Sequence, residues 1–208
     1  MNVIDALKWR YAVRRFSAER LEEHKVQDLL DATRLSATSY GLQPYRMIVI
    51  DDIETRKQLL PYAMGQDKVA ECSHLVVLAV RTNVDDEMVE RYIQTVAESR
   101  RVPLQQLEGL AAHIKEVFSA MDEAQKREWA HQQVYIALGT LLTSAAMMKI
   151  DSCPMTGFER SGFDHVLGLA ERGLESSVVC ALGVRHSEDE NASLPKVRYE
   201  QAEMVIAM

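Results

Sequence analysis

The sequence has few cysteines and no excess of basic residues, and each shortage argues against a class of function. Cys72, Cys153 and Cys180 stand far apart in apolar surroundings, without the paired spacing of a zinc site or a redox dithiol. They are expected to be reduced and buried, as in a cytoplasmic protein. The 31 acidic residues outnumber the 24 basic ones, giving a net charge of −7. Such a surface repels nucleic acid and acidic membranes, so neither is an expected partner.

Long apolar runs are lacking as well. The most apolar stretch, residues 134–148, is short for a membrane span and contains glycine, threonine and serine. A buried core helix or an interface helix explains it better. The start of the chain has no charged region followed by an apolar one, so no secretory signal is expected. These features predict a protein that works in the cytoplasm and away from membranes.

The length of 208 residues fits one domain, residues 1–208, that can bury a substantial core. Residues from about 84 to 122 carry charges on their outward helical positions and predict a helical excursion from that core. No internal repeat or low-complexity linker divides the chain.

Predicted helices and strands alternate along the chain, which favours an α/β or α+β sandwich over a helical bundle. Periodicity places helices at 2–9, 20–35, 53–62 and 160–169 and strands at 47–50, 75–80 and 176–184. Residues 124–149 predict one long helix that becomes apolar nearly all round and must therefore be buried in the core or between subunits. The apolar segment 204–208 is expected to add a strand or to wrap a partner.

Two pairs of basic residues stand near opposite ends of this acidic chain. If residues 10–16 are helical, Arg10 and Arg14 share a face, which costs roughly 0.2–0.5 kcal/mol unless an anion lies between them. In an extended segment Lys196 and Arg198 also point the same way. The pairs are either unrelated surface charge, the commoner case, or two halves of one phosphate clamp closed by the fold.

Six short motifs, spread over nearly the whole chain, resemble the flavin-dependent nitroreductase family in their order. Each is weak alone, and the ordered set is specific. They are Arg10-Tyr11-Ala12-Val13-Arg14-Arg15-Phe16, the Ser/Thr loop 36–44, Gln66-Asp67-Lys68 ahead of Ser73-His74, Gln133-Val134-Tyr135, Pro154-Met155-Thr156-Gly157-Phe158 and Leu194-Pro195-Lys196-Val197-Arg198.

The resemblance implies an α+β fold, a nitroreductase-like three-layer α-β-α sandwich with a mixed sheet flanked by helices. It also implies a homodimer with the long central helix at the dimer interface and FMN bound between the subunits. In this family the positions matching Arg10, Lys196 and Arg198 hold the FMN phosphate, and the position matching Arg14 meets the pyrimidine edge of the flavin. Several charge-assisted donors, including bidentate guanidiniums, suit a phosphate.

The same resemblance assigns the residues around the flavin ring. Lys68 would face the N1/O2 edge, where negative charge accumulates on reduction, and a fixed cation there favours hydride acceptance. A backbone N–H of Thr156 or Gly157 would donate to N5. The remaining cofactor-binding positions are Tyr11, Ala12, Gln66, Pro154 and Met155, together with Gln133 on the long helix, and Thr38, Ser39 and Gly41 from the partner subunit.

Two aromatic residues, Tyr40 and Phe118, are assigned to the substrate site. Phe118 lies on the excursion, in roughly the place where relatives carry an aromatic that covers the flavin. Ordinary packing is the alternative for Phe118.

Four positions depart from the family pattern. Ala12 replaces a serine, so only its backbone can contact the cofactor. Gly65 stands where many members have an asparagine that bonds the flavin, and Gln66 is expected to take over. Thr156 replaces an acidic residue beside N5, and Gly41 replaces a common asparagine, so substrate range and pocket polarity are expected to differ.

The predicted function is an FMN-dependent oxidoreductase that transfers hydride from NAD(P)H through flavin N5 to a nitroaromatic, a quinone or a similar small-molecule electron acceptor, by a ping-pong mechanism. The sequence shows no Ser/His/Asp or Cys/His constellation, and no second ligand stands at metal spacing from His186. No catalytic side chain or metal is therefore predicted, because the cofactor carries the chemistry. The alternatives are a flavoenzyme of the same fold with another reaction, such as dehalogenation or enone reduction, and a non-catalytic dimeric interaction protein.

Overall fold

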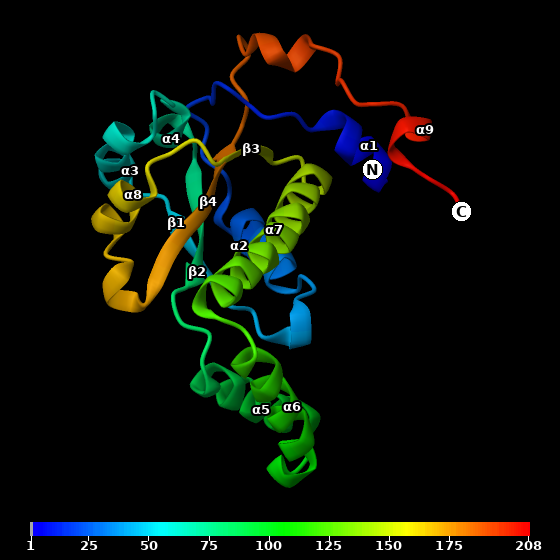
Figure 1. Ribbon diagram of the computed structural model, residues 1–208. Coiled ribbons are helices and arrows are strands. Elements are labelled where there is room, and N and C mark those ends of the chain that lie inside the picture. The colour runs from blue at the N-terminus through cyan, green and yellow to red at the C-terminus, as the bar shows by residue number, and fades with distance from the viewer. Residues whose placement is uncertain (1) are drawn as a thin grey trace.

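A four-stranded sheet stands between two layers of helices in the computed structural model, which describes residues 2–208 (Figure 1). The strand order is β1-β2-β4-β3. The strands are β1 (Tyr45–Ile50), β2 (His74–Arg81), β3 (Asp151–Met155) and β4 (Leu174–Gly183). The three-layer α+β sandwich expected from the sequence is confirmed.

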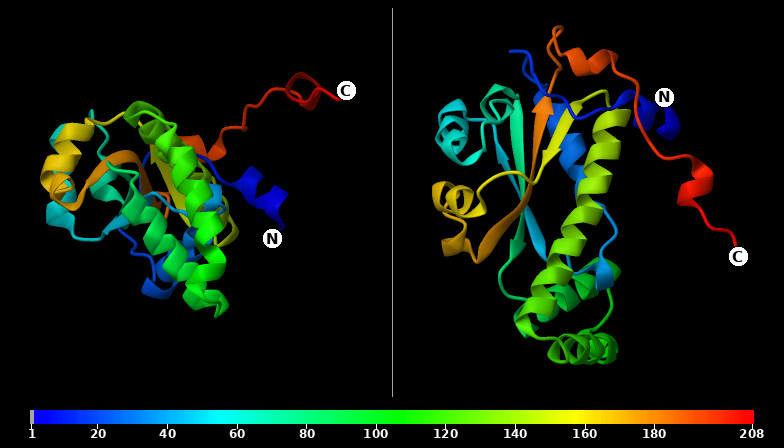
Figure 2. Two further views of the ribbon diagram at one scale, coloured as in Figure 1. Left: turned by 60° about the horizontal axis from the view of Figure 1, so that its bottom comes forward. Right: turned by 45° about the horizontal axis from the view of Figure 1, so that its top comes forward.

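The sheet differs from the mixed sheet that was predicted, because all three of its strand pairings are antiparallel. Within residues 2–208, parallel pairing is confined to the isolated bridge between Ala12 and Ser152. The segment 204–208, which could have added a strand, does not join the sheet and extends away from it (Figure 2). The part of the chain that the structure describes therefore offers no further strand to run parallel to a neighbour.

Alternate residues of β2 face the two helical layers, as the two-residue period of a strand requires. Val76 and Leu78 pack in one buried cluster with α2 (Glu23–Arg34) and α7 (Glu123–Met147). Leu75 and Val77 pack in a second cluster with α3 (Ile53–Leu59) and α8 (Arg160–Leu167). β2 and β4 are consequently covered on both faces and are buried at nearly every position.

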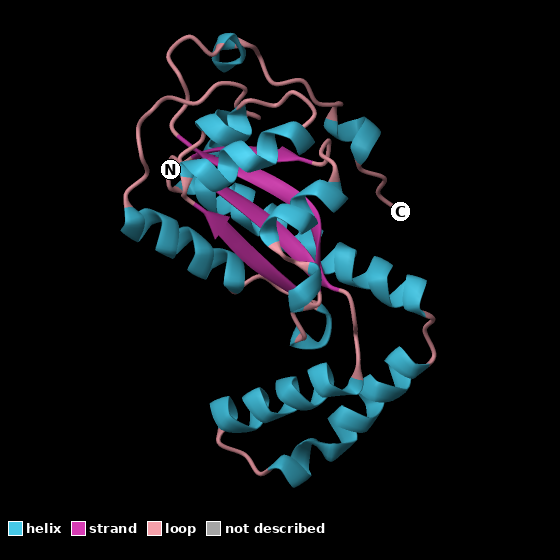
Figure 3. Ribbon diagram, turned by 90° about the vertical axis from the view of Figure 1, so that its left-hand side faces the viewer, coloured by secondary structure: helices cyan, strands magenta, loops and turns pink. Residues whose placement is uncertain are grey.

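The predicted excursion is a pair of helices, α5 (Asp86–Arg100) and α6 (Glu108–Ser119), that extends beyond one end of the sheet (Figures 1 and 3). The carboxylate of Asp85 caps α5 by accepting a hydrogen bond from the backbone of Met88. A capping box between Asp122 and Gln125 begins α7. These caps mark the beginning of α5 and of α7, and Arg101, whose φ is +55°, ends α5 ahead of α6.

The other elements are short. They are α1 (Val3–Trp9), α4 (Lys68–Glu71), α9 (Gln201–Met204) and short 3-10 turns between the longer elements. The helix predicted at 53–62 is α3 followed by one such turn, and the helix predicted at 20–35 begins three residues later than expected, at Glu23. Four-residue α4 is too short to show helical periodicity and was not predicted.

The long helix α7 is not buried on every side within one chain. Val134, Ala137 and Leu141 are fully buried against the sheet layer, whereas Tyr135 and Ile136 on the other side are each 46% exposed. This outer side of α7 is therefore available for contact with a second subunit. No helix of the described chain is long and apolar enough to cross a membrane.

Candidate functional site

Segments from the two ends of the chain meet and bring three basic residues together. Arg10 follows α1, and Lys196 and Arg198 lie in the extended segment before α9. The amine of Lys196 donates a hydrogen bond to the backbone carbonyl of Arg10. All three residues line one cavity of about 500 Å³. We call these three residues the cationic cluster.

The cationic cluster fits an anion because its charges have no partner in the described chain. Burial, assisted by the charge of Arg198, lowers the pKa of Arg10, and burial together with both arginines lowers the pKa of Lys196. The Nε atom of Arg10 is buried and has no hydrogen-bond partner within residues 2–208. A buried donor without an acceptor is costly, and an incoming phosphate oxygen would supply the acceptor.

A second cavity, of about 690 Å³, adjoins the first, since both are lined by Ala12, Arg14 and Pro154. Five further residues of the predicted site line this larger cavity: Gln66, Lys68, Met155, Thr156 and Gly157. The two cavities form a continuous path from the cationic cluster to the loop after β3, which is the arrangement expected for a phosphate at one end and a planar ring at the other.

The loop after β3 presents backbone donors to this path. β3 is an edge strand that pairs with β4 alone among the named strands. The backbone N–H of Gly157 donates no hydrogen bond within the described residues. It is therefore free to bond a ligand, and a bond from Thr156 or Gly157 to flavin N5 stays a prediction.

Gln66 makes two hydrogen bonds within the chain besides the flavin contact expected of it, which stays a prediction. Its side-chain amide donates to the carbonyls of Gly157 at 2.6 Å and Ala63 at 3.1 Å. The amide nitrogen thus ties the Gly65 turn to the loop after β3. Its oxygen atom accepts no hydrogen bond from residues 2–208, so only acceptor capacity is left for a ligand.

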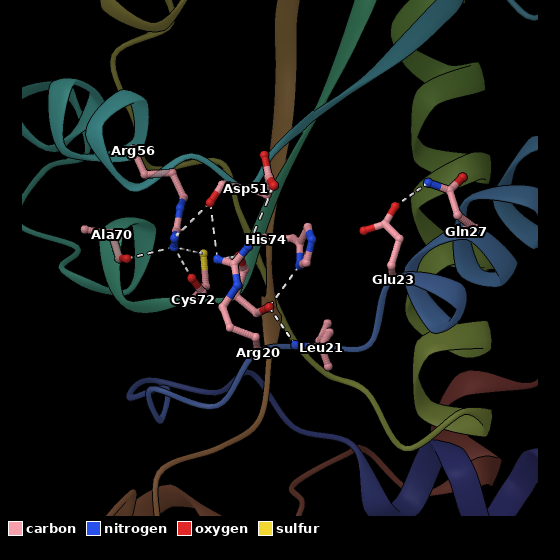
Figure 4. A network of polar contacts seen from close by, with 10 residues as sticks. Arg20, Leu21, Glu23, Gln27, Asp51, Arg56, Ala70, Cys72 and His74 are labelled. Carbon is pink, nitrogen blue, oxygen red and sulfur yellow. Dashed lines mark hydrogen bonds and ion pairs between the residues drawn. The ribbon is translucent and has the colours of Figure 1, made fainter.

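α4, the short helix that Lys68 begins, is held at its other end by a network that connects α3, α4 and the start of β2 (Figure 4). The guanidinium of Arg56, which is 3% exposed, donates to the carbonyl of Ala70 at 2.7 Å and also to that of Cys72. Arg20 donates to the carbonyl of Ser73 at 2.7 Å. The buried arginine fixes the end of α4, and Lys68 begins the same helix.

Cys153, the cysteine that lines this path, is expected to be unreactive. Cys153 lines the larger cavity but is 3% exposed. Burial raises the pKa of its thiol, although the positive charge of Lys68 opposes the shift. The thiol is therefore protonated at neutral pH, and the three cysteines are free and buried, as predicted.

Asp189 connects the two chain-end segments and was missed by reasoning from the sequence. Its carboxylate is buried and accepts hydrogen bonds from the backbone N–H groups of Arg14 and Asn191, at 2.8 and 3.1 Å, and from the hydroxyl of Tyr11, at 3.2 Å. Burial alone would raise the pKa of Asp189, but the backbone hydrogen bonds lower it. The ionised carboxylate therefore holds the Arg10–Arg14 segment against the loop that leads to Lys196.

Arg185 is a further supporting residue without a local sequence signal. Its guanidinium lies between the rings of Trp9 and Tyr11, 4.5 and 4.6 Å from their centroids. It also bonds the buried carboxylate of Asp151 through Nε at 2.9 Å and Nη2 at 2.6 Å. Burial raises the pKa of Tyr11 to about 12 despite Arg185, so its hydroxyl remains a donor.

The other predicted site residues lie apart from these cavities. Thr38, Ser39, Gly41 and Gln133 form a second group, in which the backbone of Ser39 donates to the side-chain oxygen of Gln133 at 2.8 Å. None of them lines either cavity of the first group. Within one chain the predicted site is therefore split into two separate groups.

Gly41 has a structural reason to be glycine. Its φ is +81°, and a Cβ atom there would lie 2.7 Å from the hydroxyl of Tyr92. An asparagine, common at this position in the family, would be strained and would displace Tyr92. The local packing of α5 thus accounts for this departure.

The two predicted substrate residues belong to an aromatic cluster. Tyr40 is 37% exposed and its ring is 6.4 Å from that of Phe118. Phe118 is 5% exposed and packs edge-on against Trp129 at 4.6 Å. These contacts favour ordinary packing for Phe118, whereas Tyr40 keeps a face that a ligand can reach.

Comparisons with known proteins agree with this geometry. The model of the nitroreductase family matches residues 7–184. A protein of Staphylococcus saprophyticus, provisionally named an NAD(P)H nitroreductase, is 32% identical over 213 residues, which cover 98% of this chain and 95% of the relative. The major NAD(P)H-flavin oxidoreductase of Aliivibrio fischeri is 29% identical over 204 residues, 94% of each chain.

Solved structures show the same fold at lower identity. A provisionally named nitroreductase of Exiguobacterium sibiricum, solved in complex with FMN, superposes with a TM-score of 0.88 at 17% identity, covering all of this chain and 98% of its own. A gut-bacterial enone reductase gives a TM-score of 0.83 at 17% identity, covering 100% of this chain and 98% of its own. These matches concern the fold alone.

Proposed function

Because this chain belongs to the nitroreductase family, we propose that it is an FMN-dependent NAD(P)H oxidoreductase acting on a nitroaromatic, a quinone or a similar acceptor. The observation that carries the proposal is the cationic cluster, with its buried, unpartnered Arg10 Nε. When bound, FMN would supply the hydride chemistry, with NAD(P)H and the acceptor using the same place in turn by a ping-pong mechanism. The protein's own residues bind and orient the reactants.

At the phosphate end, Arg10, Lys196 and Arg198 supply charge-assisted donors. Guanidiniums form paired hydrogen bonds with phosphate oxygens, and the desolvation that lowers the pKa of Arg10 strengthens its interaction with an anion. Asp189 takes no part in this binding directly. It holds the backbone of Arg14 in place beside the cluster.

At the ring end, Arg14, Lys68 and the Gly157 N–H surround the larger cavity. The positive charge of Lys68 would stabilise negative charge that develops on the ring system, and a single N–H can hold one ring nitrogen in register. The hydrogen bond from the side-chain amide of Gln66 to the Gly157 carbonyl keeps the Gly157 N–H in position to bond the ring. The protein thus tunes the reaction through fixed charges and donors, without a catalytic side chain.

The split of the predicted site supports a homodimer with FMN at the interface. α1 packs against α7, and both helices leave apolar side chains exposed in the single chain, among them Ile4, Leu7 and Ile136. A second copy covering this surface would bury these side chains. The group of Thr38, Ser39 and Gly41 of one subunit would then complete the cavities of its partner, as the family resemblance implies, and Gln133, hydrogen-bonded to Ser39, would come with it.

The three free, buried cysteines support the predicted cytoplasmic location, where thiols remain reduced. The nature of the acceptor would depend on two exposed residues, Thr156 on the loop after β3 and Tyr40, which a second subunit would bring to the ring. Neither is charged, which suits a neutral aromatic or quinone.

The proposal is tested by purifying the protein and recording its visible absorption spectrum, then measuring NADH and NADPH oxidation against a panel of nitroaromatics, quinones, enones and halogenated phenols. A yellow protein that is bleached by NAD(P)H and reoxidised by nitroaromatics or quinones supports it. Preference for enones or halogenated phenols would assign a different reaction to the same fold. A colourless protein that takes up no added FMN would instead indicate a non-catalytic interaction protein.

A further inference from the structure

A second basic cavity lies at the end of the sheet away from the cationic cluster. It has a volume of about 460 Å³. Its lining consists of Arg46, Ile48, Arg81, Leu167, Leu169, Arg172 and Leu174. These residues come from β1, the end of β2, and the connection from α8 to β4, which Figure 1 shows at the opposite end of the sheet from the amino-terminal segment. It shares no lining residue with the two cavities described above.

Strand geometry accounts for the arrangement of its arginines. Arg46 pairs with Ala79 across β1 and β2, and Arg81 lies two residues beyond Ala79 on the same strand. Residues two apart on a strand, and directly paired residues, share a face of the sheet. The side chains of Arg46 and Arg81 therefore leave the sheet on the same side.

The floor of the cavity is apolar. Ala79, Leu169 and Leu174 form a small buried cluster of their own, with Ile48 and Leu167 packed against it. α8 ends at Leu167, and within residues 2–208 only the three-residue 3-10 turn Ala170–Arg172 lies between it and β4. The lining contains aliphatic side chains and guanidiniums, and none of the side-chain hydroxyls or amides that commonly help to hold a small hydrated anion.

The arginines have no counter-charge of their own. Among the ion pairs of residues 2–208, none involves Arg46, Arg81, Arg172 or the nearby Arg91. Arg91 lines a smaller cavity of about 260 Å³ that also uses Arg46 and Arg81. Burial, followed by the charges of Arg81 and Arg91, lowers the pKa of Arg46. In a chain with a net charge of −7, this is a local concentration of unpaired positive charge.

We propose that this cavity binds an amphiphilic organic anion, with one carboxylate on an aliphatic or aromatic body. The carboxylate would lie between Arg46, Arg81 and Arg172, because guanidiniums bond carboxylates through paired N–H donors. The apolar body would lie on Ile48, Leu169 and Leu174. The volume lies within the roughly 300–1,000 Å³ typical of small-molecule sites.

The test is titration calorimetry of the full chain saturated with FMN, so that binding of the probe at the cofactor site is prevented. The probes are octanoate, which has both required parts, 1-octanol, which lacks the charge, and inorganic phosphate, which lacks the apolar body. Octanoate is expected to bind with an affinity at least about tenfold above either control, since each part contributes. No octanoate binding, or equal binding of phosphate, would overturn the proposal.

Variants locate the binding. Arg81→Met and Arg172→Met each remove a charge while keeping an unbranched stem, and each is expected to weaken octanoate binding by about tenfold, the size of a lost charge-assisted hydrogen bond. Arg172 lies in an exposed turn, so its variant should fold normally even if Arg81→Met does not. Arg100→Met, at the exposed end of α5 and outside the cavity, is the matched control and should bind octanoate as the parent does. Unchanged affinity in Arg172→Met and Arg81→Met, with thermal melting unaltered, would place octanoate elsewhere and refute the assignment.

Discussion

The buried carboxylate of Asp189 accepts a hydrogen bond of 2.8 Å from the backbone N–H of Arg14, 175 residues away in the sequence. This bond and its companion from Arg15 join the two chain-end segments that carry the cationic cluster. Asp189→Asn keeps the shape of the side chain but offers these donors a weaker, uncharged acceptor. We expect FMN affinity to fall about tenfold, since hydrogen bonds to a charged group are worth roughly 1.5–3 kcal/mol. Equilibrium fluorescence titration of FMN measures the change, and unaltered affinity would show that the cluster assembles without Asp189.

Asp189 also predicts a pH dependence of stability. Its pKa is lowered in the folded chain from an ordinary value of 3.8. The stabilisation from the carboxylate should therefore be complete above about pH 4 to 5 and decline as the pH falls through the folded-state pKa. Urea unfolding of the parent and of Asp189→Asn should give a stability difference that is constant at higher pH and narrows below pH 3.8. A difference that widened on acidification would contradict this sign.

Arg10 should strengthen FMN binding but should not stabilise the folded chain when FMN is absent. Its buried, unpartnered Nε and lowered pKa indicate a destabilising, half-buried charge. Arg10→Met is expected to weaken FMN binding by about ten- to a hundredfold, and to leave the melting temperature of the FMN-free protein unchanged or raised. Arg34→Met is the control, because Arg34 is exposed and paired with Asp31. A variant that melts earlier without FMN would mean that Arg10 is structural.

Glycines 41 and 65 allow backbone strain to be separated from packing. Both have positive φ, but a Cβ at Gly65 would meet nothing within 4 Å, whereas one at Gly41 would strike Tyr92. Gly65→Ala should cost about 1–2 kcal/mol of stability, from strain alone. Gly41→Ala should cost about 1–3 kcal/mol more, from displacement of the tyrosine ring. Equal losses in chemical denaturation would show that Tyr92 moves aside freely.

The exposed face of α7 predicts the oligomeric state. Ile136→Asp introduces a charge at an apolar position that is 46% exposed in the single chain. If this face is the dimer interface, the variant should sediment as a monomer and lose FMN, since the predicted site needs both subunits. Leu104→Asp places the same charge at an exposed apolar residue of the excursion and should leave the dimer intact. Dimers of normal stability in Ile136→Asp would rule out this face.

The sequence predicted the parts of this molecule that depend on local pattern. The main helices and strands follow from periodicity, and the meeting of Arg10 with Lys196 and Arg198 follows from the ordered motifs of the family. Boundaries moved by a few residues, and α4 was too short to be detected. The expected mixed sheet was wrong, because antiparallel and parallel pairing depend on connections that periodicity does not report.

The supporting residues could not be predicted, since their partners are distant in the sequence. Asp189 reads as one acid in a polar loop, and Arg56 as an ordinary helix-surface cation, until the fold brings backbone groups to them. For α7 the sequence predicted too much burial. Its apolar composition indicated burial on every side, and only the structure shows which of its residues remain exposed within one chain.

The exposed segment that carries Lys196 and Arg198 has a practical consequence for handling the protein. Trypsin cleaves after lysine and arginine, and exposed chain ends are preferred sites of proteolysis. A phosphate held by these two side chains, together with a partner covering the segment, would shield both bonds from the protease. The rate at which trypsin releases the last residues therefore offers a simple gel-based measure of how much of a preparation is loaded and assembled.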